Sequence, residues 1–171
     1  IKPEDVYWCS ADIGWVTGHS YIVYGPLSAG ATSVMYEGAP DTPDFGRWWG
    51  LVEKYKASIL YTSPTAIRAL IRQGDQWPEK YDLSSLRSLS VGAAPAPQAL
   101  KEWIVSTFGD ILSEGYGTTE NGMITYLPPG MQKKKPGSCG VPHAHAAVRI
   151  RDAEERDLPA GEEGEIWVKT P

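Results

Sequence analysis

The segment from Glu114 to Glu120, Glu-Gly-Tyr-Gly-Thr-Thr-Glu, holds the side chains of this chain that are best suited to chemistry. Tyr116 could stack on a nucleotide base, and the two glycines would let the backbone approach a ligand closely. The threonine hydroxyls could donate to phosphate oxygens, and Glu120 could hold a hard cation such as Mg²⁺. The same residues could also form a plain turn, with a threonine capping a helix and Glu120 in its first turn. The seven residues alone leave both interpretations open.

The overall composition indicates an ordinary globular domain and excludes one class of partner. Hydrophobic residues make up 42% and charged residues 22% of the 171 residues, which is enough for a real core. The formal net charge is −5, so the chain has no basic footprint for nucleic acid. The local basic run from Lys133 to Lys135 is either a solvated surface or a site that steers phosphate.

The two cysteines and the chain ends bear on the cellular setting. Cys9 and Cys139 are far apart and outside any metal-binding spacing, so we expect reduced thiols and a cytoplasmic protein. A single disulfide bridge in a secreted protein is the alternative. No stretch reaches the length of a membrane span, and the first residues are not a signal peptide. Both ends read as the middle of a longer sequence, so we expect an excised piece of a larger protein.

Strand-like and helix-like patterns alternate along the first 130 residues. We expect strands at 6–9, 32–36, 58–62, 86–91 and 110–113, and helices at 18–27, 48–55, 64–71 and 97–108. The alternation predicts an α/β fold, with a mainly parallel sheet and helices on both faces. In such sheets ligands bind beyond the carboxyl ends of the strands. The loops that follow Val91 and Ser113 should therefore meet at one rim.

The pattern changes in the last quarter of the chain. The segments 146–150 and 164–169 read as β-strands joined by a charged turn. We therefore divide the chain into an αβ subdomain at 1–130, which carries the candidate site, and a linker with a partial β subdomain at 131–171.

Four separate stretches carry recognisable motifs. Residues 116–120 read Tyr-Gly-Thr-Thr-Glu, and residues 164–168 read Gly-Glu-Ile-Trp-Val. Residues 11–21 begin Ala-Asp-Ile-Gly-Trp-Val-Thr-Gly, and residues 59–68 read Ile-Leu-Tyr-Thr-Ser-Pro-Thr-Ala-Ile-Arg. In their order along the chain, the four stretches resemble motifs of the AMP-forming acyl-CoA synthetases, which are part of the adenylate-forming superfamily. The last two are similar to stretches of acetyl-CoA synthetases.

This resemblance implies a fold and a reaction. The chain would be the second αβ subdomain of the family's large domain, followed by the first strands of a small β-barrel subdomain. In the family's reaction a small-molecule carboxylic acid attacks the α-phosphate of ATP in the presence of Mg²⁺, which gives acyl-AMP and pyrophosphate, and the thiol of CoA then takes the acyl group. Such chemistry needs neutralised phosphate charge and in-line reactants rather than a protein nucleophile.

The resemblance also implies roles for individual residues. Tyr116 would stack on adenine, and the catalytic pair would be Thr119 at the α-phosphate and Glu120 at Mg²⁺. The other expected ATP and AMP contacts are Gly92, Ala93, Ala94, Pro95, Glu114, Gly115, Gly117 and Thr118. The expected acyl and CoA contacts are Trp15, Val16, Thr17, Ser58, Val91 and Gly117. For Trp15 and Val16, packing in the core is an open alternative.

Gly117 departs from the acetyl-CoA synthetase pattern. Those enzymes have a tryptophan at this place, which closes the acyl pocket around a two-carbon acid. A hydrogen in place of an indole should open volume at the pocket floor. We therefore expect an acid larger than acetate. The loop 92–95 agrees, since it resembles general acyl- and aryl-CoA ligases more than the acetate enzymes.

Parts of the family pattern fall outside the sequence. The phosphate loop would lie before Ile1, and the domain with the catalytic lysine would lie after Pro171. We therefore expect the chain alone to be inactive, and its cut edges to favour self-association. An adenylation domain that loads a carrier protein and a non-catalytic nucleotide-binding module are the alternatives.

Overall fold

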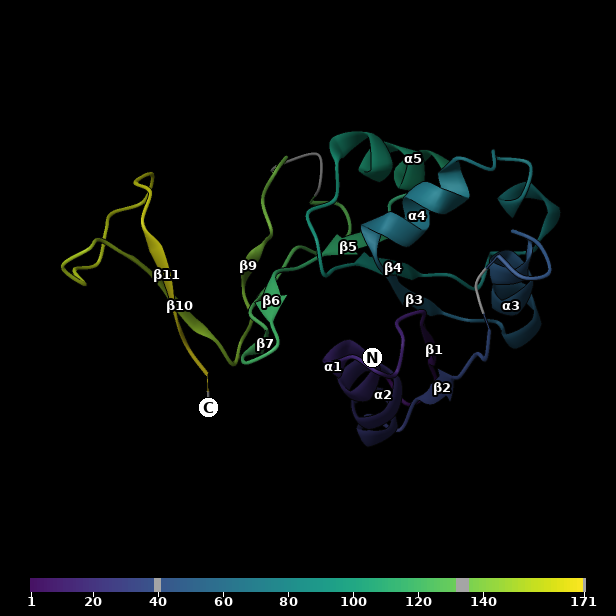
Figure 1. Cartoon of the computed structure of the whole chain (residues 1–171), viewed down its shortest axis with the longest axis horizontal. Helices are drawn as coiled ribbons and strands as arrows, with labels where there is room; N and C mark the ends of the chain where they lie inside the picture. The colour runs from purple at the N-terminus through teal and green to yellow at the C-terminus, as the bar shows by residue number, and fades with distance from the viewer. Residues whose placement is uncertain (39–40, 132–135, 171) are drawn as a thin grey trace.

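A parallel five-stranded sheet forms the centre of the chain in the computed structural model, which describes residues 1–38, 41–131 and 136–170 (Figure 1). The strand order is β2-β1-β3-β4-β5, and every neighbouring pair is parallel. The strands are β1 (Val6–Cys9), β2 (Thr32–Val34), β3 (Ile59–Thr62), β4 (Ser88–Val91) and β5 (Leu112–Glu114). The expected parallel α/β sheet is confirmed. The lysine run at 133–135 lies outside the described residues.

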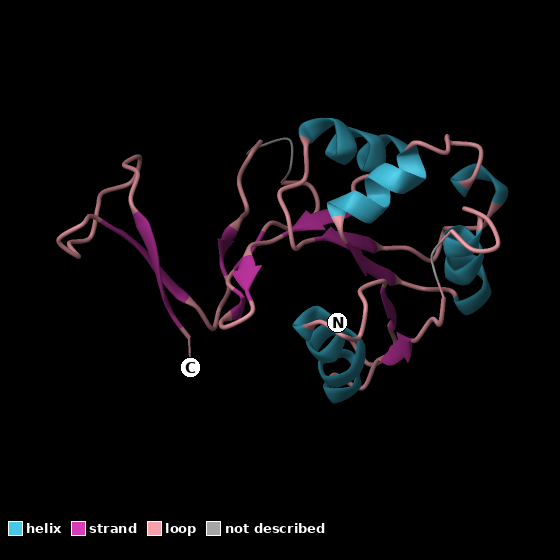
Figure 2. Cartoon of the chain, viewed as in Figure 1, coloured by secondary structure: helices cyan, strands magenta, loops and turns pink. Residues whose placement is uncertain are grey.

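Helices cover both faces of this sheet, as the alternation predicted (Figure 2). One face packs against α3 (Arg47–Tyr55), α4 (Pro64–Ile71) and α5 (Gln98–Phe108). The other face packs against a continuous helical stretch made of α1 (Val16–Gly18), the π-helix η1 (His19–Tyr24) and α2 (Gly25–Ser28). A short 3₁₀ turn, η2 (Pro78–Lys80), precedes β4. No helix among the described residues is long and apolar enough to cross a membrane.

Side chains alternate between the two faces because the strand period is two. Trp8 and Leu60 point into the larger core under α3, α4 and α5, where Trp8 lies 5.2 Å from Trp48 between ring centroids. Tyr7 and Tyr61 point to the opposite face, against Ile22. The central strands β1 and β3 are therefore buried on both sides, as in other parallel sheets.

The second part of the chain consists of short antiparallel pairs. The pair β6 (Gly117–Thr118) and β7 (Gly122–Met123) is followed by the pair β8 (Thr125–Tyr126) and β9 (Val141–Pro142). The strands β10 (Ala147–Arg151) and β11 (Glu165–Lys169) then form a hairpin that extends away from the sheet (Figure 1). The division proposed at residue 130 falls between β8 and β9, which are paired, so this ladder joins the two parts.

An ion pair between a buried carboxylate and a half-exposed guanidinium fixes the amino ends of three strands. Asp5 is buried, and it accepts hydrogen bonds from Arg87 Nε at 3.0 Å and Nη2 at 2.5 Å and from Ser58 Oγ at 2.8 Å. Ser58 Oγ also accepts from the amide of Val6 at 3.1 Å. The hydrogen-bonded Arg87 guanidinium holds the pKa of Asp5 well below its usual range. This clamp joins the chain just before β1, β3 and β4.

The clamp corrects one sequence-based assignment. Ser58 was expected near the path of CoA, but it lies before the amino end of β3, at the opposite edge from the rim where ligands bind. In a parallel sheet the start of a strand lies at the amino edge, and there Ser58 contacts Asp5 and Val6.

We predict that Asp5→Asn lowers the free energy of unfolding by about 2 kcal/mol at pH 7, because it leaves the Arg87 charge without its buried partner. Urea denaturation of the chain measures this loss. Asp82→Asn is the matched control, since Asp82 pairs with Lys56 at 2.8 Å on the exposed surface and should cost much less.

The same variant should show a defined pH dependence. The pKa of Asp5 is lowered in the folded chain, so its stabilising effect is present above the unfolded value of about 3.9 and is lost as the pH falls below it. The difference between wild type and Asp5→Asn should therefore be full at pH 7 and should shrink as the pH falls from about 5 toward 2. A difference that stays constant over this range would contradict the role of Asp5.

Candidate functional site

The strand order creates a natural place for a ligand between β1 and β3. From β1 the chain passes to β2 on one side, and from β3 it passes to β4 and β5 on the other. Loops at such a switch point diverge and leave a crevice beyond the carboxyl ends of the strands. A cavity of about 630 Å³ opens there. Its position follows from the strand order alone.

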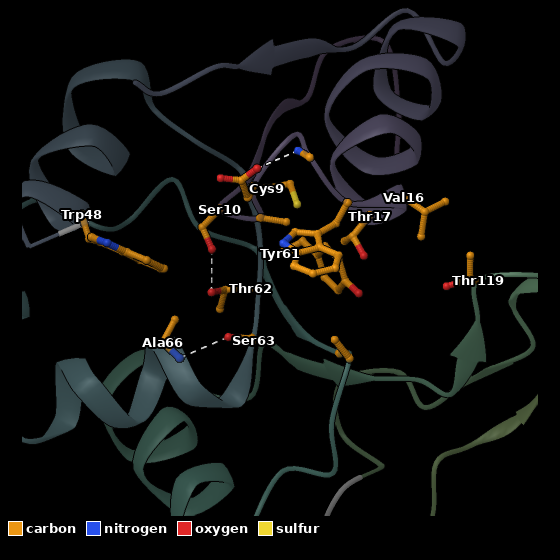
Figure 3. A pocket seen from close by; sticks show the side chains of 16 residues that line it. Cys9, Ser10, Val16, Thr17, Trp48, Tyr61, Thr62, Ser63, Ala66 and Thr119 are labelled. Carbon is orange, nitrogen blue, oxygen red and sulfur yellow. Dashed lines mark hydrogen bonds between the residues drawn. The ribbon is translucent and has the colours of Figure 1, made fainter. Parts of the chain in front are cut away.

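The walls of this cavity come from β1, α1, α3, β3, α4 and several loops (Figure 3). Trp48 of α3 and Ala66 of α4 lie at one end, and Val16, Thr17 and Thr119 lie at the other. Between them, Ser10 Oγ donates to Thr62 Oγ1 at 2.7 Å and ties the loop after β1 to the last residue of β3. The further lining residues are Cys9, Ala11, Asp12, Gly14, Trp15, Tyr61, Ser63, Gly92 and Ala93.

A smaller cavity of about 300 Å³ adjoins the larger one, between the helical stretch that starts at Val16 and the β6–β7 hairpin. The two cavities share Val16, Thr17, Tyr61, Gly92, Ala93 and Thr119, so they are two chambers of one site. The smaller chamber is completed by Ser20, Tyr21, Gly115, Gly117, Thr118, Gly122 and Met123. Thr119 borders both chambers, which suits a group that would act where two substrates meet.

Neither the Cys9 thiol nor the Tyr61 phenol at the site is activated as a nucleophile. Burial raises the pKa of the Cys9 thiol to about 11, so it stays protonated at neutral pH. Burial also raises the pKa of the Tyr61 phenol to about 12. The arrangement can bind and orient reactants, and it offers hydroxyls and backbone groups rather than a thiolate or phenolate.

The structure brings most of the expected site residues together. Those that line a chamber are Trp15, Val16, Thr17, Gly92, Ala93, Gly115, Gly117, Thr118 and Thr119. Trp15 is 71% exposed and Val16 is 43% exposed, so the alternative that they pack in the core is wrong. Five expected contacts line neither chamber, although each lies within two residues of one that does: Ala94, Pro95, Glu114, Tyr116 and Glu120.

Val91 is a second correction. It was expected to contact the substrate, but its side chain is 2% exposed and belongs to the larger core. Alternation along β4 places Leu89 and Val91 on the face under α4 and α5. Gly92, one residue later, is the first of this segment to reach the chambers.

The motif residues form a hairpin rather than a capped helix. Gly117 and Thr118 pair with Met123 and Gly122, and no helix follows Thr119 in the described part of the chain. Thr118 Oγ1 accepts from the amide of Asn121 at 3.2 Å and closes the turn. The capping interpretation is therefore wrong, and Thr119 and Glu120 stand exposed at the tip of the hairpin.

Two glycines are required by close contacts at the site. A Cβ at Gly117 would lie 2.3 Å from the carbonyl oxygen of Gly122 across the hairpin. A Cβ at Gly92 would lie 2.5 Å from the phenolic oxygen of Tyr61. Gly117 therefore serves the hairpin directly, in addition to lining the smaller chamber. This contact across the hairpin is a second reason for a glycine at position 117, which the sequence alone does not show.

Two aromatic residues, Tyr21 and Tyr61, also line the smaller chamber and were not among the expected contacts. The rings of Tyr21 and Tyr61 lie 5.2 Å apart between centroids. Thr17, Ser20 and Tyr21 have the spacing of one helical face, so a search for polar and aromatic partners of Thr17 at i+3 and i+4 would have found them. Tyr61 lies next to the carboxyl end of β3, where the fold class predicts ligand contacts.

The metal ligand expected from the sequence is one carboxylate, that of Glu120. Among the described residues, no group of three or more His, Cys, Asp or Glu side chains could hold a metal ion. Glu120 is exposed at the hairpin tip beside the chamber wall formed by Thr119. One carboxylate fits Mg²⁺, which commonly takes one or two protein ligands and completes its shell with water and substrate phosphate.

Comparison with known proteins decides the family. Residues 1–171 match the model of a family described as AMP-binding enzyme. The chain belongs to the AMP-binding enzyme family. The family resemblance found in the sequence is thereby confirmed.

Individual relatives of the family agree. The chain is 47% identical to the acetyl-coenzyme A synthetase of Methanothrix thermoacetophila, over 100% of this chain and 26% of that one. It is 50% identical to that of Streptomyces avermitilis, over 100% and 27%. The crystal structure of VinN superposes with a TM-score of 0.81 at 26% identity, over 99% of this chain and 41% of that one. The chain thus spans about a quarter of the length of these curated relatives.

Ala93 carries backbone strain in the middle of the site. It has φ 69°, and it lines both chambers. For a residue with a Cβ this left-handed conformation costs roughly 1–2 kcal/mol. Such strain persists where the surroundings impose it, often at binding sites.

We predict that Ala93→Gly relieves this strain, whereas Ala94→Gly only adds freedom to the unfolded chain. Glycine costs roughly 0.5–1 kcal/mol in unfolded-state entropy at either position. The free energies of unfolding of the two variants, measured by urea denaturation, should therefore differ by about 1–2 kcal/mol, with Ala93→Gly the more stable. Equal stabilities would show that the conformation of Ala93 is not strained.

Proposed function

We propose that residues 1–171 form the acyl- and nucleotide-binding part of an AMP-forming acyl-CoA synthetase. The parent enzyme would use ATP to convert a carboxylic acid to acyl-AMP and would then transfer the acyl group to CoA. The observation that carries this proposal is the two-chambered site at the switch point, with Thr119 of the adenylate motif on the wall between the chambers. The similarity to the acetyl-coenzyme A synthetases of Methanothrix thermoacetophila and Streptomyces avermitilis supports it.

The geometry supports a division of roles. Tyr116, which is 37% exposed, and the loop 92–95 would hold the adenine at the rim. Thr119 would contact the α-phosphate where it meets the carboxylate of the acid. Glu120 would hold Mg²⁺, which supplies positive charge to the phosphates when it is bound. The acyl group would enter the smaller chamber, and CoA would approach through the larger one, past Trp15 and Thr17.

The chemistry of this proposal needs no covalent enzyme intermediate. The carboxylate oxygen bonds to the α-phosphorus while pyrophosphate leaves, and the thiolate sulfur of CoA later displaces AMP from the acyl carbon. The chain's own task is to align these groups and to exclude competing water. The protonated thiol of Cys9 supports this reading. Both cysteines are free, which supports a cytoplasmic location for the parent enzyme.

An engineered enzyme tests the proposed function. Residues 1–171 would replace the matching segment of the Streptomyces avermitilis relative, which they match at 50% identity. We expect carboxylate-dependent exchange of pyrophosphate into ATP, followed by a thioester when CoA is added. A folded hybrid with neither activity would refute the proposal. Exchange without any use of CoA would favour an adenylation domain that loads a carrier protein.

The chain by itself should not adenylate. It spans about a quarter of the curated relatives, and Thr119 and Glu120 are the only residues of the motif to which we assign phosphate and metal contacts. We expect pyrophosphate exchange by the isolated chain to stay at the level of the blank. Robust exchange by the isolated chain would contradict this prediction, and tight AMP binding without exchange would favour a nucleotide-binding module.

We further propose that the parent enzyme prefers an acid larger than acetate. Gly117 lines the smaller chamber without a side chain, and the chamber retains about 300 Å³ beside Tyr21 and Tyr61. In the hybrid enzyme, Gly117→Trp should shift relative kcat/KM toward acetate and propionate by about ten-fold or more, because an indole would fill that volume.

Gly117→Ala is the matched control for this shift. Its Cβ meets the same carbonyl oxygen of Gly122 at 2.3 Å, but it fills little of the chamber. We expect it to lower activity toward all acids alike. An unchanged preference in Gly117→Trp, or the same shift in both variants, would overturn the proposed acid size.

A further inference from the structure

A buried ion pair lies directly behind the nucleotide loops. Lys101 Nζ is 2.5 Å from Glu114 Oε2, and the two side chains are 7% and 11% exposed. Every other ion pair among the described residues has at least one partner with a side chain 49% or more exposed. This burial makes the pair unlike the other ion pairs of the chain.

Stability alone does not account for such a pair. Removing two charges from water is costly, and well-packed hydrophobic residues of similar size are often as stable or more so. Glu114 Oε2 is buried and has no protein hydrogen-bond donor among the described residues beyond the contact with the Lys101 ammonium. The charge of Glu114 is therefore balanced by Lys101. The reason for the pair lies in what it connects.

The pair bridges the two loops of the proposed nucleotide site. Lys101 lies in the first turn of α5, where its amide donates to the carbonyl of Pro97 at 3.2 Å, just after the loop 92–95. Glu114 is the last residue of β5, just before Gly115 and Tyr116. In the register of the sheet Glu114 lies beside Val91, the residue that precedes the first loop. The sheet ladder thus holds the start of loop 92–95 beside Glu114, and the ion pair holds the helix that follows this loop to the same residue.

The backbone around Glu114 is hydrogen-bonded to the segment 125–127. The backbone of Glu114 exchanges two hydrogen bonds with Leu127, at 3.1 and 2.7 Å. The amide of Tyr116 donates to Thr125 Oγ1 at 3.1 Å. These bonds attach residues 114–116 to the segment 125–127, but none of them reaches α5. The Lys101 contact is the side-chain link from Glu114 to the helix that follows loop 92–95.

We propose that Lys101 is a positioning residue of the nucleotide site, which fixes the separation of loops 92–95 and 115–119 through Glu114. The inference rests on the proposed function, because it assigns these loops to ATP. Lys101 itself touches no substrate in this proposal. Its loss would let the start of α5, where the chain continues from loop 92–95, move relative to Glu114, and the nucleotide that the two loops enclose would bind more weakly.

The link is tested first on the isolated 171-residue chain. In Lys101→Met, amide hydrogen exchange should become faster in both loops, 92–95 and 115–119. Lys56→Met is the matched control, since it breaks the exposed pair with Asp82 and should leave both loops unchanged. Faster exchange in only one loop, or uniformly through the chain, would overturn the proposal.

A second variant keeps the test open if Lys101→Met does not fold. The double variant Lys101→Met/Glu114→Gln leaves no unpaired charge in the interior, so it should fold and still show both loops loosened. Lys101→Arg keeps the positive charge and should restore protection in both loops. A double variant with wild-type protection would show that the link is not needed.

The catalytic consequence is measured in the hybrid enzyme. Lys101→Met should raise KM for ATP about ten-fold, while kcat and KM for the acid change less than about two-fold. A merely structural role would reduce the active fraction and leave KM for ATP unchanged. An inactive hybrid with wild-type Lys101 would overturn the proposed function and the nucleotide role of Lys101 together. If the hybrid is active and Lys101→Met leaves its KM for ATP unchanged, only the role of Lys101 is overturned.

Discussion

Parallel pairing of five strands is the constraint on which the rest of this structure depends. Parallel strands need crossover connections, and these return every strand in the same direction. All carboxyl ends therefore lie at one edge, and the change of direction between β1 and β3 opens that edge. The two edges have different tasks. The Asp5–Arg87–Ser58 clamp secures the amino edge, whereas the carboxyl edge carries loops with strained or exposed residues such as Ala93 and Thr119.

Much of this arrangement follows from the sequence, because its signals are periodic or local. The alternation of strand and helix patterns predicts the parallel sheet, and the fold class then places the loops after Val91 and Ser113 at one rim. The hairpin at Gly117 to Met123 was not predictable in this way. Strands of two residues show no period, and the pattern of threonines and glutamate there also suits a helix cap.

Other features depend on contacts that no local pattern reports. Val91 and Gly92 are neighbours, yet one lies in the core and the other lines the chambers, because a shift of one residue in a strand changes the face. The partners of Ser58 are Asp5 and Val6, more than fifty residues away. The Lys101–Glu114 pair joins a helix to the strand that follows it. In the sequence, Lys101 reads as an ordinary surface lysine, and only the packing of α5 shows that it is buried.

The clamp at the amino edge also sets an order of events during synthesis. Arg87 lies 82 residues after Asp5, and Ser58 lies 53 residues after it. A ribosome adds residues one at a time from the amino end, so β1 emerges long before its clamp can close. Until Arg87 has left the exit tunnel, the carboxylate of Asp5 lacks its charged partner, although Ser58 can already bond to it. The clamp is therefore complete only once the residue directly before β4 has emerged.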